Sequence, residues 1–152
     1  MKKFNLLRKQ LTKKQAAFDS AKTIVNPAGG WLNAVRTSLG MSLEQVAHKL
    51  GVSKQNVQSL EMREKQKTIS LKSLEAVAHA MDMQLVYALI PKDDSLDALI
   101  ERKAEALAYD LVQRTAQTMI LEDQEVPYER LKDAVAERKQ EIIRNNPKTL
   151  WD

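Results

Sequence analysis

The chain has 152 residues and a formal net charge of +4, with 43% hydrophobic and 29% charged residues. This length allows one domain with its own hydrophobic core, plus an extension. The chain contains no cysteine, which excludes a disulfide framework and thiolate metal ligands, and no apolar run approaches the ~20 residues of a membrane-spanning helix.

Charge is distributed unevenly along the chain. Residues 1–72 contain 14 Lys or Arg against 4 Asp or Glu, whereas residues 73–152 contain 10 against 16. A basic half is typical of proteins that bind nucleic acid, although a solvated basic helix is the alternative. The first residues lack the apolar core of a signal peptide, so we expect a cytoplasmic, nucleoid-associated protein without a membrane partner.

Residues 3–18 predict a basic amphipathic helix that precedes the first acidic residue, Asp19. Four apolar side chains share one side of this helix: Phe4, Leu7, Leu11 and Phe18. Such a helix suits two roles equally well, an arm that grips DNA phosphates or an amphipathic helix that docks on a partner. The sequence Asn-Pro-Ala-Gly-Gly at 26–30 breaks the pattern, so we expect residues 1–30 to form a basic N-terminal helix or arm.

The segment 42–64 predicts a helix-turn-helix. Ser42 is placed to cap the first helix, and Gln45 three residues later completes a capping box. Gly51 ends that helix, where a left-handed conformation suits glycine, and Ser53 caps the second helix. Such a unit places its second helix in the major groove of DNA.

Further helices complete a bundle around this unit. The first spans residues 31–39, with four residues directed inward: Trp31, Leu32, Val35 and Leu39. Ser70 caps another helix, in which apolar residues repeat at helical spacing: Leu71, Leu74, Val77, Ala78 and Met81. In the helix-turn-helix itself the inward residues are Val46, Ala47, Leu50, Val57 and Leu60.

The second helix of the unit carries small polar side chains on its outward face. Gln55 is the best candidate for reading a base, because a glutamine amide can both donate to and accept from an adenine edge. The residues expected at base edges are Lys54, Gln55, Gln58 and Ser59. The residues expected at phosphates are Ser42, Lys49, Ser53, Asn56 and Lys65.

Residues 84–90 form the best strand candidate in the chain, because they are almost wholly apolar and end at Pro91. A lone strand cannot satisfy its own backbone, so we expect it to pair with the same segment of a second molecule. The expected dimer contacts are Leu85, Val86, Tyr87, Leu89 and Ile90. A continued helix end and an isolated extended segment are the alternatives. The DNA-binding domain would then span residues 31–91.

Residues 92–152 predict an acidic helical extension. Asp94 or Ser95 caps a long helix that ends near Leu121, and Pro127 suits the first turn of a last helix. Its apolar face is predicted from the larger residues Leu96, Leu99, Ile100, Leu107, Leu111, Thr115 and Met119. The acidic cluster at 122–125 predicts either a solvated loop or a site for a partner or divalent ion.

Catalytic chemistry finds no support in the sequence. His48 and His79 are the only histidines, and neither has a companion at ligand spacing. No metal-binding helix motif, glycine-rich phosphate loop or serine–histidine pairing is present. We therefore expect no enzyme, no cofactor and no metal site.

The helix-turn-helix segment resembles the XRE family, whose members have a Cro/repressor-like fold. The resemblance implies a structural salt bridge between Arg36 and Glu61, which match the positions of an Arg–Glu pair in that family. The expected fold class is therefore mainly α, a Cro/repressor-like helix-turn-helix bundle with one short dimerising β-strand and a helical C-terminal extension.

Segments outside the helix-turn-helix resemble a narrower group, mobile mystery protein A. They include Gly29-Gly30-Trp31, the runs 40–43, 68–74, 85–91 and 118–124, and the final Leu150-Trp151-Asp152. The resemblance implies association with a partner, mobile mystery protein B, that carries a Fic domain. Known Fic-inhibiting helices carry Ser/Thr-x-x-x-Glu followed by Gly or Asn, and no segment of this chain fits that pattern.

Together these features predict a sequence-specific transcriptional repressor that binds double-stranded DNA. A symmetric homodimer predicts an inverted-repeat operator. The resemblance implies autoregulation of an operon that encodes the Fic-domain partner. The alternative is an antitoxin-like protein whose primary role is to bind and inhibit a Fic-type toxin.

Overall fold

The chain folds into two compact helical units. In the computed structural model, the residues described are 2–121, 127–145 and 147–152. One unit comprises residues 20–88, and the other comprises residues up to Asp19 together with 89–152. The sequence placed its boundaries at 30/31 and 91/92, whereas these units divide at 19/20 and 88/89. The basic N-terminal helix therefore belongs to the same unit as the acidic C-terminal region.

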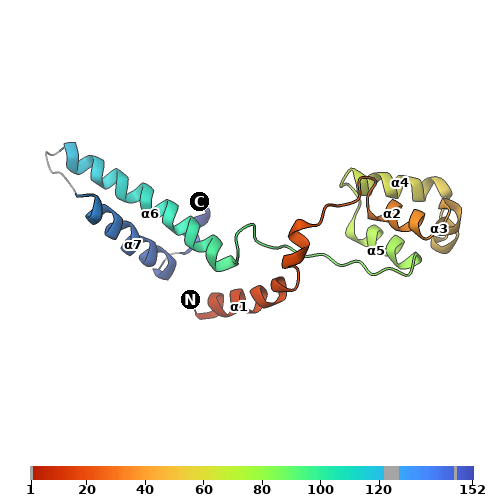
Figure 1. Cartoon of the computed structure of the whole chain (residues 1–152), viewed down its shortest axis with the longest axis horizontal. Helices are drawn as coiled ribbons and strands as arrows, with labels where there is room; N and C mark the ends of the chain where they lie inside the picture. The colour runs from red at the N-terminus through yellow and green to blue at the C-terminus, as the bar shows by residue number, and fades with distance from the viewer. Residues whose placement is uncertain (1, 122–126, 146) are drawn as a thin grey trace. The chain divides into compact units, whose positions relative to one another are not determined.

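The unit at residues 20–88 is a bundle of four α-helices (Figure 1). They are α2 (Trp31–Ser38), α3 (Leu43–Leu50), α4 (Lys54–Lys65) and α5 (Leu71–Ala80), after a 3-10 helix η1 (Asp19–Thr23). Their core consists of Leu32, Val46, Ala47, Val57, Val77 and Met81. Two inward predictions are wrong, because about half of the surface of Trp31 and Leu39 remains exposed, and Leu71 of the apolar repeat in α5 is exposed to the same extent.

Three serines begin three of these helices, as the sequence predicts. The Ser42 hydroxyl accepts the Gln45 backbone N–H at 3.1 Å, and the Gln45 amide oxygen accepts the Ser42 N–H at 2.8 Å. The Ser53 and Ser70 hydroxyls cap α4 and α5 by accepting the backbone N–H groups of Asn56 and Ser73. Gly51 ends α3 with φ 68°, in the left-handed region. The capping box and the glycine stop are therefore confirmed, and together they fix the turn between α3 and α4.

The predicted strand at residues 84–90 is not found. Within the described part of the chain no residue is assigned to a β-strand, and this segment is extended without ladder hydrogen bonds. The segment forms no strand because a β-strand needs a neighbouring strand for its ladder hydrogen bonds, and a single copy of the described chain offers none. Val86, Tyr87 and Leu89 are 61%, 70% and 89% exposed.

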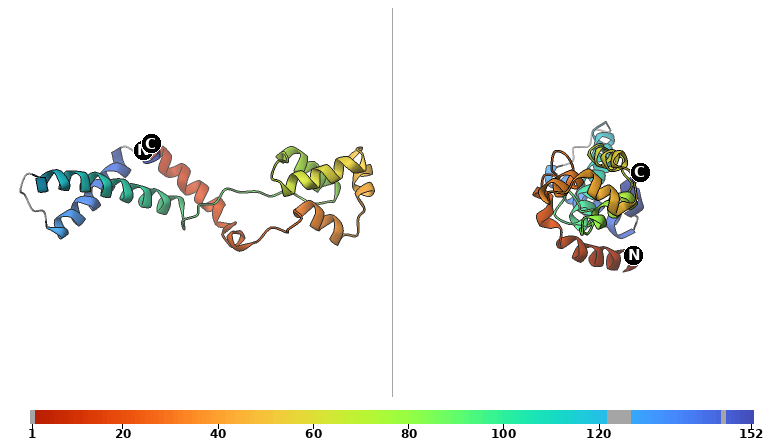
Figure 2. Two further views of the ribbon diagram at one scale, coloured as in Figure 1. Left: turned by 90° about the horizontal axis from the view of Figure 1, so that it is seen from above. Right: turned by 90° about the vertical axis from the view of Figure 1, so that its right-hand side faces the viewer.

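The second unit is built on a hairpin of two helices, α6 (Leu96–Leu121) and α7 (Tyr128–Asn145), which pack along each other (Figures 1 and 2). Helix α1 (Lys2–Ala16) packs against α6, and the 3-10 helix η2 (Pro147–Trp151) contacts both hairpin helices. Ser95 is the residue that caps α6, because its hydroxyl accepts the Ala98 N–H at 3.0 Å. The acidic cluster at 122–125 lies outside the described residues.

The hairpin core is made of small side chains. Ala104 and Ala108 are fully buried and Ala116 is 5% exposed, while Ile142 and Leu150 supply the larger buried groups. The sequence-based face of α6 named larger residues, and this prediction was partly wrong: Ile100, Leu107 and Leu111 pack partly buried against this core, whereas Thr115 and Met119 are exposed. Alanines at intervals of four and eight let α7 approach closely, so the contact follows the small residues.

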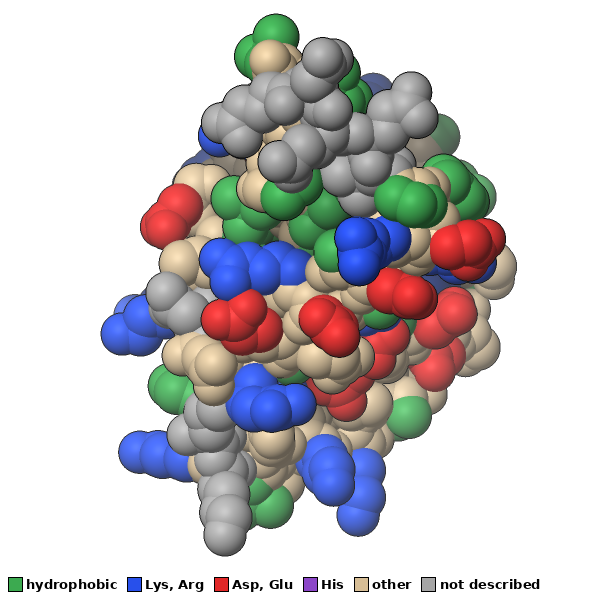
Figure 3. Space-filling model, turned by 90° about the vertical axis from the view of Figure 1, so that its left-hand side faces the viewer, with side chains coloured by type: hydrophobic (Ala, Val, Ile, Leu, Met, Phe, Trp, Pro, Cys, Tyr) green, Lys and Arg blue, Asp and Glu red, His purple; other side chains and the backbone are tan. Residues whose placement is uncertain are grey.

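The surface of the protein carries mixed charge. On the face in Figure 3, acidic and basic side chains alternate, with hydrophobic side chains exposed between them. An example is the bidentate pair that Arg102 of α6 forms with Asp93, which precedes the helix, at 2.8 and 3.0 Å; the pair raises the pKa of Arg102 above its ordinary value. No helix in the described residues has the length and hydropathy needed to cross a membrane.

Candidate nucleic-acid interface

Helix α4 has one face in the core and one face in solvent. Val57 is fully buried and Leu60 is half-buried. The four residues predicted to read bases are all exposed: Lys54, Gln55, Gln58 and Ser59. Because the core fixes one side of the helix, the other side presents its amides and hydroxyl in a defined order.

The exposed face of α4 contains a residue that the sequence reading missed. Met62 follows Gln55 by seven residues and Ser59 by three, so the three side chains share one stripe. Half of the surface of Met62 is exposed. Met62 is apolar but lies outside the core, because α4 buries the side that carries Val57 and Glu61. A thioether there suits apolar contact with a thymine methyl group.

Lys54 forms an ion pair at the start of α4. Its Nζ lies 3.3 Å from Glu44 Oε1, so α3 supplies a carboxylate beside the start of α4. Both side chains remain largely exposed, at 50% and 71%. This acidic group lies against a lysine that is a candidate for contact with DNA, and it opposes the approach of a polyanion.

The candidate phosphate contacts lie at the starts and at the ends of α3 and α4, since Lys49 is in the last turn of α3 and Lys65 is the last residue of α4. Ser42 and Ser53 cap α3 and α4, and each hydroxyl keeps its own O–H available as a donor. Asn56, Lys49 and Lys65 are exposed, and neither lysine forms an ion pair with any described residue. Helix N-termini and free lysines are the groups that commonly hold phosphates.

Arg36 and Glu61 form an ion pair between α2 and α4. Arg36 Nε donates to Glu61 Oε1 at 2.5 Å and Nη2 donates to Oε2 at 3.2 Å, while Asn33 Nδ2 donates to Oε2 at 3.0 Å. Arg36 Nη1 also donates to the Met41 carbonyl at 3.0 Å. The Glu61 carboxylate is thus almost wholly enclosed and fully hydrogen-bonded, which is the condition under which a buried pair is tolerated.

A second carboxylate of α4 caps α2, and the sequence reading did not identify it. Glu64 Oε1 accepts the Trp31 N–H at 2.8 Å, and Oε2 accepts the Leu32 N–H at 2.9 Å. Gly30 precedes α2 with φ 87° and has no side chain that could serve as a cap; a Cβ there would lie 2.8 Å from Glu64 Oε2. The signal in the sequence was a glycine at the helix start, which needs a cap from elsewhere.

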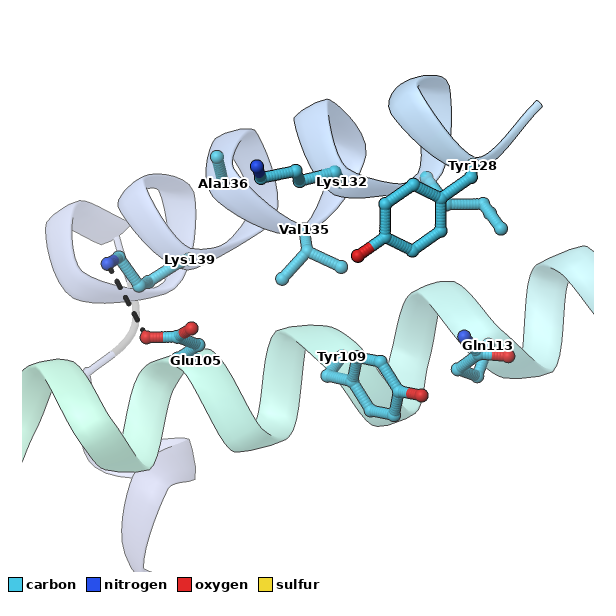
Figure 4. Close-up of a pocket in the computed structure, with 9 residues that line it drawn as sticks. Glu105, Tyr109, Gln113, Tyr128, Lys132, Val135, Ala136 and Lys139 are labelled. Atoms are coloured by element: carbon cyan, nitrogen blue, oxygen red, sulfur yellow. Dashed lines mark ion pairs between the residues drawn. The ribbon is translucent and has the colours of Figure 1, made fainter. Parts of the chain in front are cut away.

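Other parts of the chain lack comparable chemistry. A pocket of about 410 Å³ lies between α6 and α7, where Tyr109 and Tyr128 come from opposite helices and Lys139 pairs with Glu105 at 3.8 Å (Figure 4). Its lining contains no histidine, cysteine or serine. Among the described residues, no cluster of three or more metal-ligating side chains is found. The histidines His48 and His79 lie exposed on α3 and α5.

Comparison with known proteins agrees with the geometry of the unit at residues 20–88. Residues 32–87 match the family model described as Helix-turn-helix. No curated protein and no solved structure gives a significant match. The match covers α2 to α5 and identifies this segment as an XRE-type helix-turn-helix domain, the kind found in DNA-binding transcription regulators.

Proposed function

We propose that this protein, a DNA-binding regulator with an XRE-type helix-turn-helix domain, is a sequence-specific transcriptional repressor that acts at the nucleoid as a homodimer. One observation carries the proposal. The outward face of α4 holds Gln55, Ser59 and Met62 in one exposed stripe, while its inward face is fixed by the core and by two carboxylates bound to α2. A helix fixed in this way can insert the same side chains into each half-site.

Recognition in this proposal combines polar and apolar readout. Gln55 pairs with an adenine through its amide. Met62 lies about two turns further along α4 and contacts a thymine methyl group. Gln58 and Ser59 lie between them and reach adjacent base edges. When DNA binds, Lys54 leaves its ion pair with Glu44 and contacts the DNA instead. The N-termini of α3 and α4 hold the flanking phosphates.

The homodimer is proposed from the segment that joins the two units. Val86, Tyr87 and Leu89 are large apolar side chains left in solvent, and the segment forms no strand ladder in the described part of the chain; the Leu89 carbonyl accepts a hydrogen bond from the Gln15 side chain. Pairing with a second copy across a two-fold axis covers these side chains and supplies the ladder, with Leu85 and Ile90 at the ends. A symmetric dimer then binds an inverted repeat whose half-site centres lie about 34 Å apart, or a multiple of that distance.

The regulatory setting is proposed from the resemblance to the mobile mystery protein A group. In that setting the protein represses its own operon, which also encodes a Fic-domain partner. An antitoxin-like role, in which partner inhibition comes first, is the second candidate. It is favoured by the separate helical unit, which exposes apolar side chains of its own.

The decisive experiment is a footprint of the purified protein on DNA upstream of its own gene, followed by Gln55→Ala. We expect a symmetric protected region, and a loss of about 1–3 kcal/mol on that operator with little change on random DNA. Gln140→Ala, the same exposed residue type on α7, is the matched control. Equal weakening on both DNAs would reduce Gln55 to a phosphate contact, and no protection at all would overturn the proposal.

A further inference from the structure

An apolar groove lies between α1 and η2 in the second unit. Its volume is about 360 Å³. Its lining residues on α1 are Phe4, Leu7, Arg8 and Leu11, and those opposite include Ile100, Leu150 and Trp151. The spacing of three and four residues places the apolar members of α1 on one stripe. This stripe faces the groove and is only about half covered by the described residues, because Phe4, Leu7 and Leu11 keep 55%, 50% and 48% of their surface exposed.

Two polar anchors hold α1 in place beside the groove. Arg8 Nε donates to Asp97 Oδ1 of α6 at 2.9 Å. Gln15, which is 8% exposed, donates from Nε2 to the Leu89 carbonyl at 2.7 Å. The helix is therefore fixed by contacts at its middle and its end, while about half of the surface of its large apolar side chains stays exposed. Fixing a helix without burying its apolar stripe leaves a preformed surface for another molecule.

The rim of the groove is cationic. Lys3 lies one turn before Leu7 on the same side of α1, Lys14 lies one turn after Leu11, and Lys148 lines the opposite wall. All three are exposed, and none forms an ion pair with a described residue. Every charged residue within α1 is basic. The surface thus combines an apolar floor with positive charge on both sides.

We propose that this groove binds an acidic amphipathic helix of a partner protein. From Phe4 to Leu11 the stripe spans seven residues, or about 10 Å at ~1.5 Å per residue, which matches two turns of a ligand helix with apolar anchors at i, i+3 or i+4, and i+7. Acidic residues beside those anchors meet Lys3, Lys14 and Lys148. The charge sets partner choice and association rate, and the apolar stripe supplies affinity.

Charge and shape disfavour the other occupants. A second copy docked symmetrically would bring two basic rims together. DNA has phosphates for the lysines but no long apolar side chains for the floor. A membrane surface is flat, whereas this groove has α1 on one side and Pro147, Leu150 and Trp151 on the other.

Trp151 supplies an intrinsic reporter, because it lines the groove and is 59% exposed. In the full chain with Trp31→Phe, it is the only tryptophan. The probe is a synthetic 16-residue helix with leucines at i, i+4 and i+7 and glutamates elsewhere; its twin carries lysines in place of the glutamates. We expect the acidic probe to shift Trp151 emission to the blue with a micromolar Kd. The basic twin should bind at least about tenfold more weakly, and the difference in Kd between the two peptides should narrow at high salt.

Paired variants separate docking from folding. Leu7→Ser removes a floor residue and should weaken the probe at least tenfold, whereas Leu6→Ser changes an equally exposed leucine that does not line the groove and should not. Lys3→Glu with Lys14→Glu should reverse the preference between the two peptides, and Lys9→Glu with Lys13→Glu, away from the rim, should not.

Two peptide results would overturn the proposal: equal binding of the acidic probe and its basic twin, or equal effects of Leu6→Ser and Leu7→Ser on probe binding. A Trp151 shift with anionic lipid vesicles but not with the peptide would assign the groove to a membrane instead. A dimer mass in light scattering that Leu7→Ser abolishes would assign it to a second copy of the chain.

Discussion

At the scale of single residues, two glutamates one turn apart on α4 have separate tasks. Glu61 neutralises Arg36 inside the bundle, whereas Glu64 replaces the missing cap of α2. A carboxylate at a helix N-terminus satisfies free N–H groups and interacts favourably with the helix dipole. The same helix that meets DNA in our proposal is therefore attached to α2 at two points.

Removal of the Glu64 carboxylate should loosen this attachment. We expect Glu64→Ala to cost about 1–2 kcal/mol and to lower the Tm of the helix-turn-helix unit by roughly 4–8 °C per kcal/mol, because two backbone donors lose their acceptor. Trp31 fluorescence in a Trp151→Phe background reports this unit. Glu75→Ala, an exposed glutamate of α5, is the control. An unchanged Tm would mean that water replaces the cap without cost.

Glu44 should restrain DNA binding. Its carboxylate pairs with Lys54 and repels DNA phosphates. Glu44→Gln should therefore tighten binding to the operator by roughly two- to fivefold at low salt, and this gain in affinity should vanish at high salt. Fluorescence anisotropy across a salt series measures the effect. Glu137→Gln, which removes an exposed charge in the other unit, should leave affinity unchanged. Weaker binding by Glu44→Gln would instead assign the carboxylate to base readout.

At the scale of elements, the sequence predicted best where a local rule determines the structure. Serine caps and the left-handed Gly51 are decided by a few neighbouring residues, and they were confirmed. The positions of Trp31 and of Ala108 depend on which helix lies opposite, and no local pattern contains that information. Glu64 was missed for the same reason, because its partners are more than 30 residues away in the chain.

The α6–α7 contact gives a test of this view. Ala108 has no exposed surface, so Ala108→Leu should overpack the hairpin and destabilise its unit by about 1–3 kcal/mol. Ala106→Leu places the same group on the exposed side of α6 and should change stability little. Thermal melts followed by Trp151 fluorescence with Trp31→Phe report this unit. Equal effects of both variants would contradict the close approach of the two helices.

At the scale of the whole molecule, the charge asymmetry of the sequence has two origins. Part of it lies in the helix-turn-helix unit, where Lys49, Lys54 and Lys65 are exposed. The rest lies in α1, which packs on α6 and pairs through Arg8 with Asp97. Arg8 of the basic N-terminal helix therefore pairs with an acidic residue of its own unit, and a linear charge count does not separate the charges of the two units.

The linking segment 84–90 carries the last prediction, because our dimer depends on it. Val86→Pro removes a backbone donor, so the proposed ribbon should fail and the mass in light scattering should fall from twice the chain mass to 17.2 kDa. Val25→Pro makes the same substitution in another exposed, extended segment and should leave the dimer intact. The monomer should keep its weak affinity for a half-site but lose the gain from joining two half-sites on one duplex. A dimer mass that survives Val86→Pro would place the two-fold axis elsewhere on the molecule, and full operator binding by a monomer would remove the reason to expect a symmetric site.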